Sequence, residues 1–336
     1  MTESSSGVSR AESNEQAVDA ARHLDISSAS GHRRNHRRDA RGWSEMRQGM
    51  NDLSSDVTRV GPHLRMMLPN LTRMEARVVE LMLQGQDFSE STPLRALAEA
   101  AGVSDAMVVK IAKKLGFAGF KEMRDLVGRY NQLPIGGLYS EISPGDAPET
   151  ILSKIFRTAI QALEETLAII NVEAFDRAAS ILAGAHNRDF YGLGGSAQIA
   201  RDVAHKFLRI GVRCNVFDDT HMMLMSAALL GSEDVAIAIS HSGQTNAIID
   251  AITLARRSGA RTIVVTSYAN APLAREADIV LSATARGSPL LGENAAARIA
   301  QLSILDALFM AVAQRDYTGA EQRLKKTMNA VIGKRG

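Results

Sequence analysis

The feature that most constrains this chain is a regular alternation of apolar strands and amphipathic helices in its second half. Runs such as "DVAIAIS", which ends at Ser240, are almost wholly apolar, and a helical stretch such as "NAIIDAITLARRSG" follows each. A strand that is apolar on both faces must be covered on both faces, which is typical of a parallel sheet between two helical layers. The pattern predicts an α/β fold with a doubly wound parallel sheet, its strands listed here: 188–193, 212–217, 234–240, 261–267 and 278–283.

Two of these strands end in loops that are suited to an anion. "YGLGGSA" and "SHSGQTN" both lie between a strand and a helix, and ligands of open parallel sheets bind beyond the carboxyl ends of the strands. Glycines allow backbone N–H groups to approach a phosphate, hydroxyls donate to its oxygens, and a helix N-terminus adds partial positive charge. The residues predicted to bind it are Gly194, Gly195, Ser196, Ser240, Ser242, Gly243 and Thr245.

The spacing in these loops excludes the commoner phosphate motifs. "GLGGSA" is not a dinucleotide fingerprint with a later ribose-binding acid, and "SGQT" is not a P-loop because no Gly-Lys-Ser/Thr follows. The alternative to a ligand site is a pair of capped turns that bind nothing. Two such loops at one sheet edge favour the site.

Residues 63–130 are predicted to form a separate, all-helical domain. Short helices are expected from Leu71 onwards, the first opening with a capping box of Thr72 and Glu75. In "LRALAEAAGVSDAMVVKIAK", Ala98 is small where two helices cross, Gly102 suits a tight turn, and apolar side chains such as Ile111 recur at helical spacing. This spacing is typical of a helix-turn-helix.

The second helix of that motif would be the recognition helix. Its outer face is polar, and residues 104–124 are locally basic, so major-groove and phosphate contacts are expected. The alternative is a helical domain with ordinary solvated lysines. The predicted DNA-binding residues are Ser104, Asp105, Ala106, Val109, Lys110, Lys113, Lys114 and Lys121.

The remaining segments are assigned from composition. Residues 1–62 are predicted to be a disordered extension, in which "GHRRNHRRDARG" is either a DNA-contacting arm or, as the nearby acidic residues favour, a solvated tail. Residues 131–148 concentrate Pro and Gly and are predicted to be a linker, and 149–330 form the α/β domain. The formal charge of +2 excludes a strongly basic protein, so a nucleic-acid surface requires local clustering of lysines.

Composition also limits chemistry and location. Cys214 is the single cysteine, so an internal disulfide and a thiolate zinc cluster are excluded, and its apolar surroundings predict an inert thiol. No bound metal or cofactor is expected. The sequence begins without the apolar segment of a secretory signal and lacks a run of about 18 apolar residues, which predicts a cytoplasmic protein with no membrane contact.

The motifs together resemble a known family. "YGLGGSA" and "IAISHSGQTNAIIDAITLARRSGARTIVVTS" resemble the sugar isomerase (SIS) domain, and "LAEAAGVSDAMVVKIAKKLGFAGFKEMR" resembles the N-terminal domain of RpiR-family transcriptional regulators. The resemblance implies a flavodoxin-like strand order, double-stranded operator DNA and a phosphorylated sugar as ligands, and homodimers or homotetramers. By motif match, Ser196, Ser240, Ser242 and Thr245 are the phosphosugar-binding positions. Lys110 stands where many members carry arginine, and Asn246 where they often carry an acid, which leaves operator and sugar undefined.

An aldose–ketose isomerase is the alternative function, because SIS domains also occur in such enzymes. Isomerisation needs a general base and usually a histidine, and the candidates His205, His221, His241 and Glu293 are scattered. His221 and Glu293 are kept as sugar contacts, His205 is expected to be a packing or surface residue of its helix, and no catalytic residue is assigned. An isomerase also has no use for the helical domain, so a non-enzymatic regulator of carbohydrate genes is favoured. A DNA-independent scaffold would not explain the lysines.

Overall fold

The computed structural model describes residues 56–83, 88–133, 142–284 and 295–334, which belong to one compact unit, Asp52–Gly336. Most of the predicted N-terminal extension, residues 134–141 of the predicted linker and Glu293 lie outside these residues. The predicted domain boundaries therefore remain predictions, except at the start of the helical domain.

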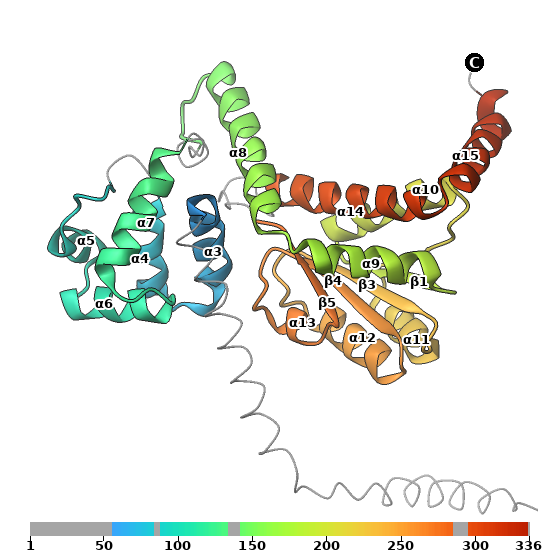
Figure 1. Cartoon of the computed structure of the whole chain (residues 1–336), viewed down its shortest axis with the longest axis horizontal. Helices are drawn as coiled ribbons and strands as arrows, with labels where there is room; N and C mark the ends of the chain where they lie inside the picture. Colours follow the sequence, from blue (N-terminus) through green and yellow to red (C-terminus); the bar gives the residue numbers. More distant parts are fainter. Residues whose placement is uncertain (1–55, 84–87, 134–141, 285–294, 335–336) are drawn as a thin grey trace, which may run out of the picture. The chain divides into compact units, whose positions relative to one another are not determined.

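The helical domain is built from short helices with short turns, as predicted (Figure 1). A glycine ends the first helix of the helix-turn-helix: Gly102 has φ 70°, and its N–H caps the carbonyls of Ala98 and Glu99. Ser104 then caps the next helix by accepting from the N–H of Met107 at 3.3 Å. The helices are α4 (Arg73–Leu83), α5 (Leu94–Ala101), α6 (Asp105–Lys114) and α7 (Phe120–Gln132).

A further helix precedes these, and the sequence pattern did not predict it. Helix α3 (Val60–Met67) follows the 3-10 turn Val57–Arg59, so residues 60–62, assigned above to the disordered extension, are helical. Val60 and Leu64 are fully buried and pack α3 into the domain. Gly61, Pro62 and Arg65 interrupt the apolar pattern of this helix, which is why the sequence alone did not reveal it.

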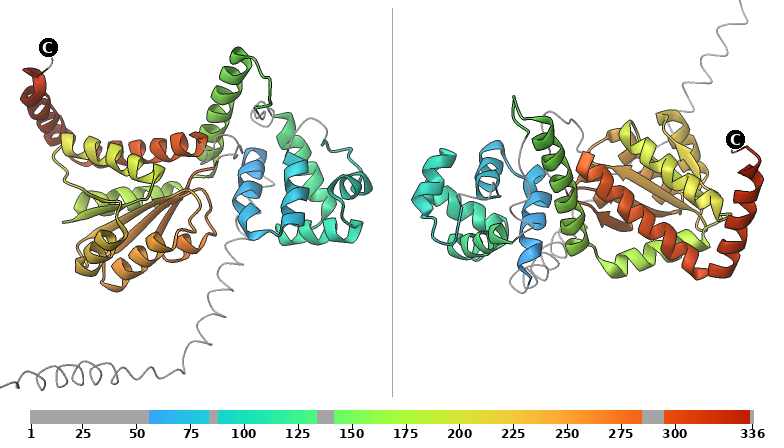
Figure 2. Two further views of the ribbon diagram at one scale, coloured as in Figure 1. Left: turned by 180° about the vertical axis from the view of Figure 1, so that it is seen from behind. Right: turned by 90° about the horizontal axis from the view of Figure 1, so that it is seen from above.

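The second part of the unit is the predicted α/β fold. Five parallel strands form one sheet in the order β2-β1-β3-β4-β5, which is the flavodoxin-like order (Figures 1 and 2). The fold class predicted from the alternating pattern is confirmed. The strands are β1 (Arg188–Tyr191), β2 (Asn215–Phe217), β3 (Val235–Ser240), β4 (Arg261–Thr266) and β5 (Ile279–Ser282).

Helices cover both faces of the sheet and create two cores (Figures 1 and 2). On one face, β-strand side chains such as Ile237 pack against α9 (Val172–Gly184), α10 (Gly195–Arg209) and α14 (Ala295–Arg315). On the other face they pack against α11 (Thr220–Leu229), α12 (Asn246–Arg257) and α13 (Pro272–Arg275). Every residue of β3 is buried, which explains the uninterrupted apolar run in the sequence.

Two long helices complete this region. Helix α8 (Pro148–Ile169) packs along α14, and α15 (Tyr317–Ile332) follows α14 at the end of the described chain. By length and composition alone α14 could cross a membrane, with a mean hydropathy of 1.5. Its side chains Ala297, Leu305 and Leu308 are almost fully buried against the sheet, so here it serves as a core helix.

Candidate functional site

The two predicted anion loops lie at the same edge of the sheet. Strand β1 pairs directly with β3 in parallel, with Tyr191 opposite Ala238, so the loops that follow the two strands leave from neighbouring carboxyl ends. The loop after β1 leads into the N-terminus of α10, and the loop after β3 leads into that of α12. An anion at this edge therefore meets two helix N-termini.

The loop after β3 is organised by its own hydroxyls. Ser240 is 5% exposed, and its Oγ accepts a hydrogen bond from the N–H of Gly243 at 3.2 Å. Ser242 Oγ accepts from the N–H of Gln244 at 3.3 Å. A hydroxyl that accepts a hydrogen bond inside the loop still has its own O–H proton to donate. Thr245 lies at the N-cap position of α12, and its side chain makes no capping bond there.

Gly243 has a strict structural role in that loop. Its φ is 60°, in the left-handed region that other residues rarely adopt. A Cβ at this position would lie 2.5 Å from the Cβ of Ala271, and the Gly243 carbonyl accepts from the N–H of Leu273 at 3.0 Å. Glycine is therefore required both by the turn and by the close approach of the loop after β4.

The loop after β1 presents backbone rather than side chains. Gly194 has φ 54° and is exposed, and α10 begins at Gly195 with Ser196 in its first turn. A Cβ on Gly192 would lie 2.9 Å from the backbone of Ser196, so the loop folds tightly over the helix start. The amides at the start of α10 are not fully used within the helix, which suits them to an anion.

A group from the loop after β4 joins this edge and was not predicted. His241 Nδ1 lies 2.8 Å from Ser267 Oγ, and its ring is 5.6 Å from the ring of Tyr268. Ser267 is buried, and burial raises the pKa of Tyr268. No sequence motif marks Ser267 and Tyr268. Their position at the end of a predicted strand, with Ser267 as its last residue and Tyr268 directly after it, was the available signal.

The other sequence candidates are placed as follows. His221 is exposed in the first turn of α11, and His205 is exposed on α10 as expected. Glu293 lies outside the described residues. Burial raises the pKa of the Cys214 thiol to about 12, which agrees with an inert thiol. Within the described ranges, no three His, Cys, Asp or Glu side chains come together to hold a metal ion.

In the helical domain, α6 has one buried and one exposed face. Val108, Ile111 and Ala112 are buried against the rest of the domain. The predicted DNA-binding positions Ser104, Asp105, Ala106, Lys110 and Lys113 are exposed, and Val109 is partly exposed. Lys121 is exposed near the start of α7. The outer face that the sequence assigned to α6 is therefore open to solvent.

Lys114 differs from the other lysines because it has a partner within the domain. Its Nζ lies 2.7 Å from Glu75 Oε2, and the Glu75 side chain is 11% exposed. Glu75 also accepts from the N–H of Thr72 at 2.8 Å, which is the predicted capping box. The Lys114 ammonium and this backbone hydrogen bond lower the pKa of Glu75. Lys114 thus joins the end of α6 to the start of α4.

Known proteins match both parts of the chain. The helix-turn-helix domain model of the rpiR family matches residues 58–131, and the SIS domain model matches residues 181–311. The HTH-type transcriptional regulator RpiR of Escherichia coli K12 is 41% identical over 268 residues, which cover 80% of this chain and 90% of that protein. The chain belongs to the RpiR family of HTH-type transcriptional regulators.

Other relatives agree with this family. An uncharacterized HTH-type transcriptional regulator of Caldanaerobacter subterraneus is 35% identical over 276 residues, covering 81% of this chain and 96% of its own. Among solved structures, the Vibrio vulnificus NanR protein complexed with ManNAc-6P has a TM-score of 0.53 at 22% identity and covers 82% of this chain and 100% of its own. The sugar isomerase domain of the Sphaerobacter thermophilus RpiR transcription factor has a TM-score of 0.50 at 24% identity, covering 53% and 98%.

These matches confirm the predicted family and function class. This RpiR-family protein is a transcriptional regulator with an N-terminal helix-turn-helix domain and a C-terminal SIS domain. Its relatives are named as regulators rather than as isomerases. Membership implies DNA as the ligand of the helical domain and a phosphosugar as the ligand of the SIS domain.

Proposed function

We propose that a phosphorylated sugar binds at the carboxyl edge of the sheet and thereby changes the affinity of the regulator for its operator. The proposal rests on the observation that the loops after β1 and β3 follow neighbouring strands and that each leads into the N-terminus of a helix. Both loops are free of lysine and arginine in the sequence. Neutral donors fixed in space suit a phosphoryl group in a partly buried site because they need little reorganisation when the ligand enters.

In this proposal the phosphoryl group contacts the amides of Gly194 and Gly195 and the hydroxyls of Ser196, Ser240, Ser242 and Thr245. Gly243 holds the loop after β3 in place. The sugar then extends towards His221 and Glu293, the two residues kept from the sequence as sugar contacts. The NanR structure, which contains ManNAc-6P, supports the ligand class through its shared fold.

The DNA-binding half of the proposal rests on α6. Ser104, Asp105, Ala106 and Val109 face the bases of the major groove, and Lys110, Lys113 and Lys121 contact the phosphates. Since Lys114 is held by Glu75, its contribution to DNA is indirect, through the position of α6. A regulator of this kind acts on chromosomal DNA, so we place it in the cytoplasm.

The regulator is also proposed to act as a homodimer or homotetramer. A single helix-turn-helix covers little DNA, and two copies can read two half-sites. Helix α8 exposes an apolar stripe at helical spacing, with Leu152, Phe156 and Ile160 61%, 66% and 46% exposed. A stripe of this kind on a long helix is suited to a second copy of the chain.

A thermal-shift screen of the full chain tests the ligand. ManNAc-6P and other sugar phosphates are compared with the same sugars without the phosphoryl group. A ligand at 100 times its Kd adds about 2.7 kcal/mol to the free energy of unfolding, which raises Tm by several degrees. A shift with phosphorylated sugars alone supports the proposal. Equal responses to phosphorylated and unphosphorylated sugars would contradict it.

A further inference from the structure

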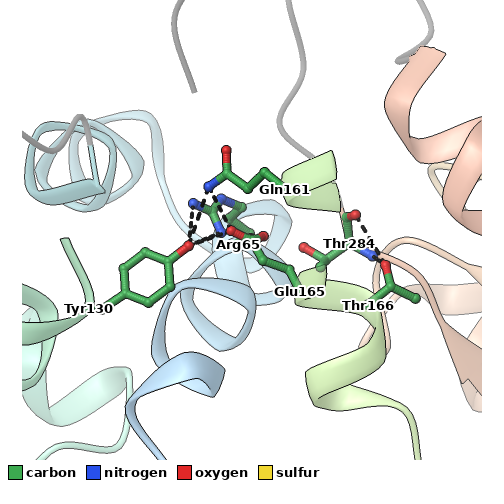
Figure 3. A network of polar contacts seen from close by, with 6 residues as sticks. All are labelled: Arg65, Tyr130, Gln161, Glu165, Thr166 and Thr284. Atoms are coloured by element: carbon green, nitrogen blue, oxygen red, sulfur yellow. Dashed lines mark hydrogen bonds and ion pairs between the residues drawn. The ribbon is translucent and has the colours of Figure 1, made fainter. Parts of the chain in front are cut away.

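Three helices of the regulator meet at a buried ion pair. The Arg65 Nη1 atom of α3 lies 2.5 Å from Glu165 Oε2 of α8, and the two side chains are 4% and 1% exposed (Figure 3). Tyr130 of α7 donates its hydroxyl to Glu165 Oε1, and both Nη atoms of Arg65 lie 3.3 Å from that hydroxyl. Gln161 Nε2 donates to Glu165 Oε1 at 2.8 Å. We call Arg65, Tyr130, Gln161 and Glu165 the latch.

The latch is a directional contact rather than an efficient stabiliser. Removing two charges from water costs free energy, and apolar side chains of the same volume often stabilise a fold more than a buried ion pair does. In addition, Arg65 Nε is buried and has no hydrogen-bond partner among the described residues. Burial alone lowers the pKa of Arg65, but the interactions with Glu165 and Tyr130 together more than offset this and raise it, so Arg65 stays charged. Such a network holds in one geometry and fails in others.

The residue after Glu165 connects the same helix to the ligand edge. Thr166 Oγ1 accepts from the N–H of Thr284 at 3.0 Å and lies 3.4 Å from its carbonyl oxygen (Figure 3). Thr284 is buried and follows β5 by two residues. Through the strand register Ser282 pairs with Thr266, and Thr266 pairs with Ser240 of the candidate site. Consecutive residues of α8 therefore contact the helical domain and the end of β5.

Helix α3 continues the connection towards DNA. His63, two residues before Arg65, places its Nε2 3.2 Å from the carbonyl oxygen of Leu115, the C-cap residue of α6. The same helix ends at Met67, whose Sδ lies 3.3 Å from Asn270 Nδ2 in the loop after β4. A displacement of α3 relative to α8 would consequently be transmitted to the helix that carries Lys110 and Lys113.

We propose that Glu165 is the positioning residue through which occupancy of the sheet edge changes operator affinity, with the Arg65–Glu165–Tyr130 contact as the element that switches. The proposal rests on the proposed function and adds the residues that couple its two sites. A ligand shifts such a switch only by its difference in affinity for the two states. The coupling is reciprocal: DNA changes the affinity for sugar by the same factor as sugar changes the affinity for DNA. Since the latch carries this coupling in our proposal, a chain without the latch binds the two ligands independently.

The test is the ratio of two operator dissociation constants. Fluorescence anisotropy on a duplex from the promoter upstream of the gene gives Kd with and without saturating ManNAc-6P. An allosteric regulator has a ratio of about 5 to 150 in either direction. We expect Glu165→Gln and Tyr130→Phe to bring the ratio to within about twofold of one, because each removes a hydrogen bond or the charge from the latch. Calorimetry on each variant without DNA measures ManNAc-6P binding separately.

Two further variants separate coupling from folding. The paired variant Arg65→Met with Glu165→Leu replaces the ion pair by apolar side chains of similar volume, which is often tolerated or stabilising. It is expected to fold, bind both ligands and lack the response. Asp306→Asn is the matched control, because it removes the 2.5 Å ion pair with Lys206 between α10 and α14. It is expected to keep the wild-type ratio.

The possible outcomes are distinct. The proposal is supported if the ratio is close to one in the latch variants while they still bind ManNAc-6P and DNA, and if Asp306→Asn keeps the wild-type ratio. A wild-type ratio in Tyr130→Phe and in the paired variant overturns it while leaving the proposed function in place. If the wild-type chain binds no sugar phosphate in calorimetry, the proposed function is wrong, and so is the role of the latch, which rests on it.

Discussion

The two surfaces that we propose to bind anions are built in opposite ways. The outer face of α6 carries exposed lysines on flexible stems, whereas the carboxyl edge of the sheet offers half-buried hydroxyls and backbone amides. Charge attracts a long polyanion from a distance and is weakened by salt. Fixed neutral donors select one small dianion by geometry instead. The comparison teaches that in the proposed phosphate site hydroxyls and backbone amides take the place of cations, because the backbone comes close.

Loss of the two serine hydroxyls after β3 has the largest expected effect. Each hydrogen bond to a charged group contributes about 1.5–3 kcal/mol, so Ser240→Ala with Ser242→Ala weakens sugar-phosphate binding by at least about 100-fold. DNA binding in the absence of ligand remains. Calorimetry measures the loss, with Ser303→Ala, an exposed serine of α14, as the control. Unchanged affinity in the double variant would remove the hydroxyls from the site.

The next largest effect is expected from the glycine that shapes the same loop. Gly243→Ala strains the backbone and brings a Cβ within 2.5 Å of Ala271 Cβ. Left-handed strain and overpacking together lower the free energy of unfolding by about 2–4 kcal/mol. Gly145→Ala, where φ is also positive but the added Cβ meets nothing within 4 Å, separates strain from overpacking. Urea unfolding gives the free energy of unfolding of both variants. Equal losses in the two would argue against the close approach of Ala271 to Gly243 as a cause.

The lysines of α6 are expected to act through salt dependence. Lys110→Ala with Lys113→Ala lowers operator affinity by about 10-fold or more at moderate salt and reduces the slope of log Kd against log salt by about 2. Sugar-phosphate binding is unaffected. Lys325→Ala with Lys326→Ala on α15 is the charge-matched control. A full salt slope in the α6 variant would place the DNA on another surface.

The smallest effect is expected for Lys114, which has a structural role because it pairs with Glu75. Lys114→Ala removes its contact with Glu75 and lowers the free energy of unfolding by about 0.5–1 kcal/mol, since the lysine is 39% exposed and partly screened. The folded-state pKa of Glu75 is lowered, so this contribution is present above the ordinary glutamate pKa and is lost as pH falls through the folded value. Urea titrations at neutral and acidic pH should therefore show a difference in the free energy of unfolding between wild type and variant that disappears in acid. A difference that stays constant with pH would mean that the ion pair is not its source.

Much of the molecule was predictable because local patterns decide it. The tight turn at Gly102 and the buried apolar run of β3 follow from short-range rules, and these features were predicted. Helix α3 was not, because its Arg65 is buried through partners far along the sequence, Tyr130 and Glu165. The role of Lys114 and the positions of Ser267 and Tyr268 likewise depend on contacts that the fold creates.

The central claim is that hydroxyls at the sheet edge report a bound sugar phosphate to the helix that reads DNA. Operator affinity of the full chain tests it most directly, measured by anisotropy as the sugar phosphate with the largest thermal shift is added. We predict a change of at least about 5-fold for the wild-type chain and less than about 2-fold for the Ser240→Ala, Ser242→Ala variant. An equal response of the two proteins would contradict the account.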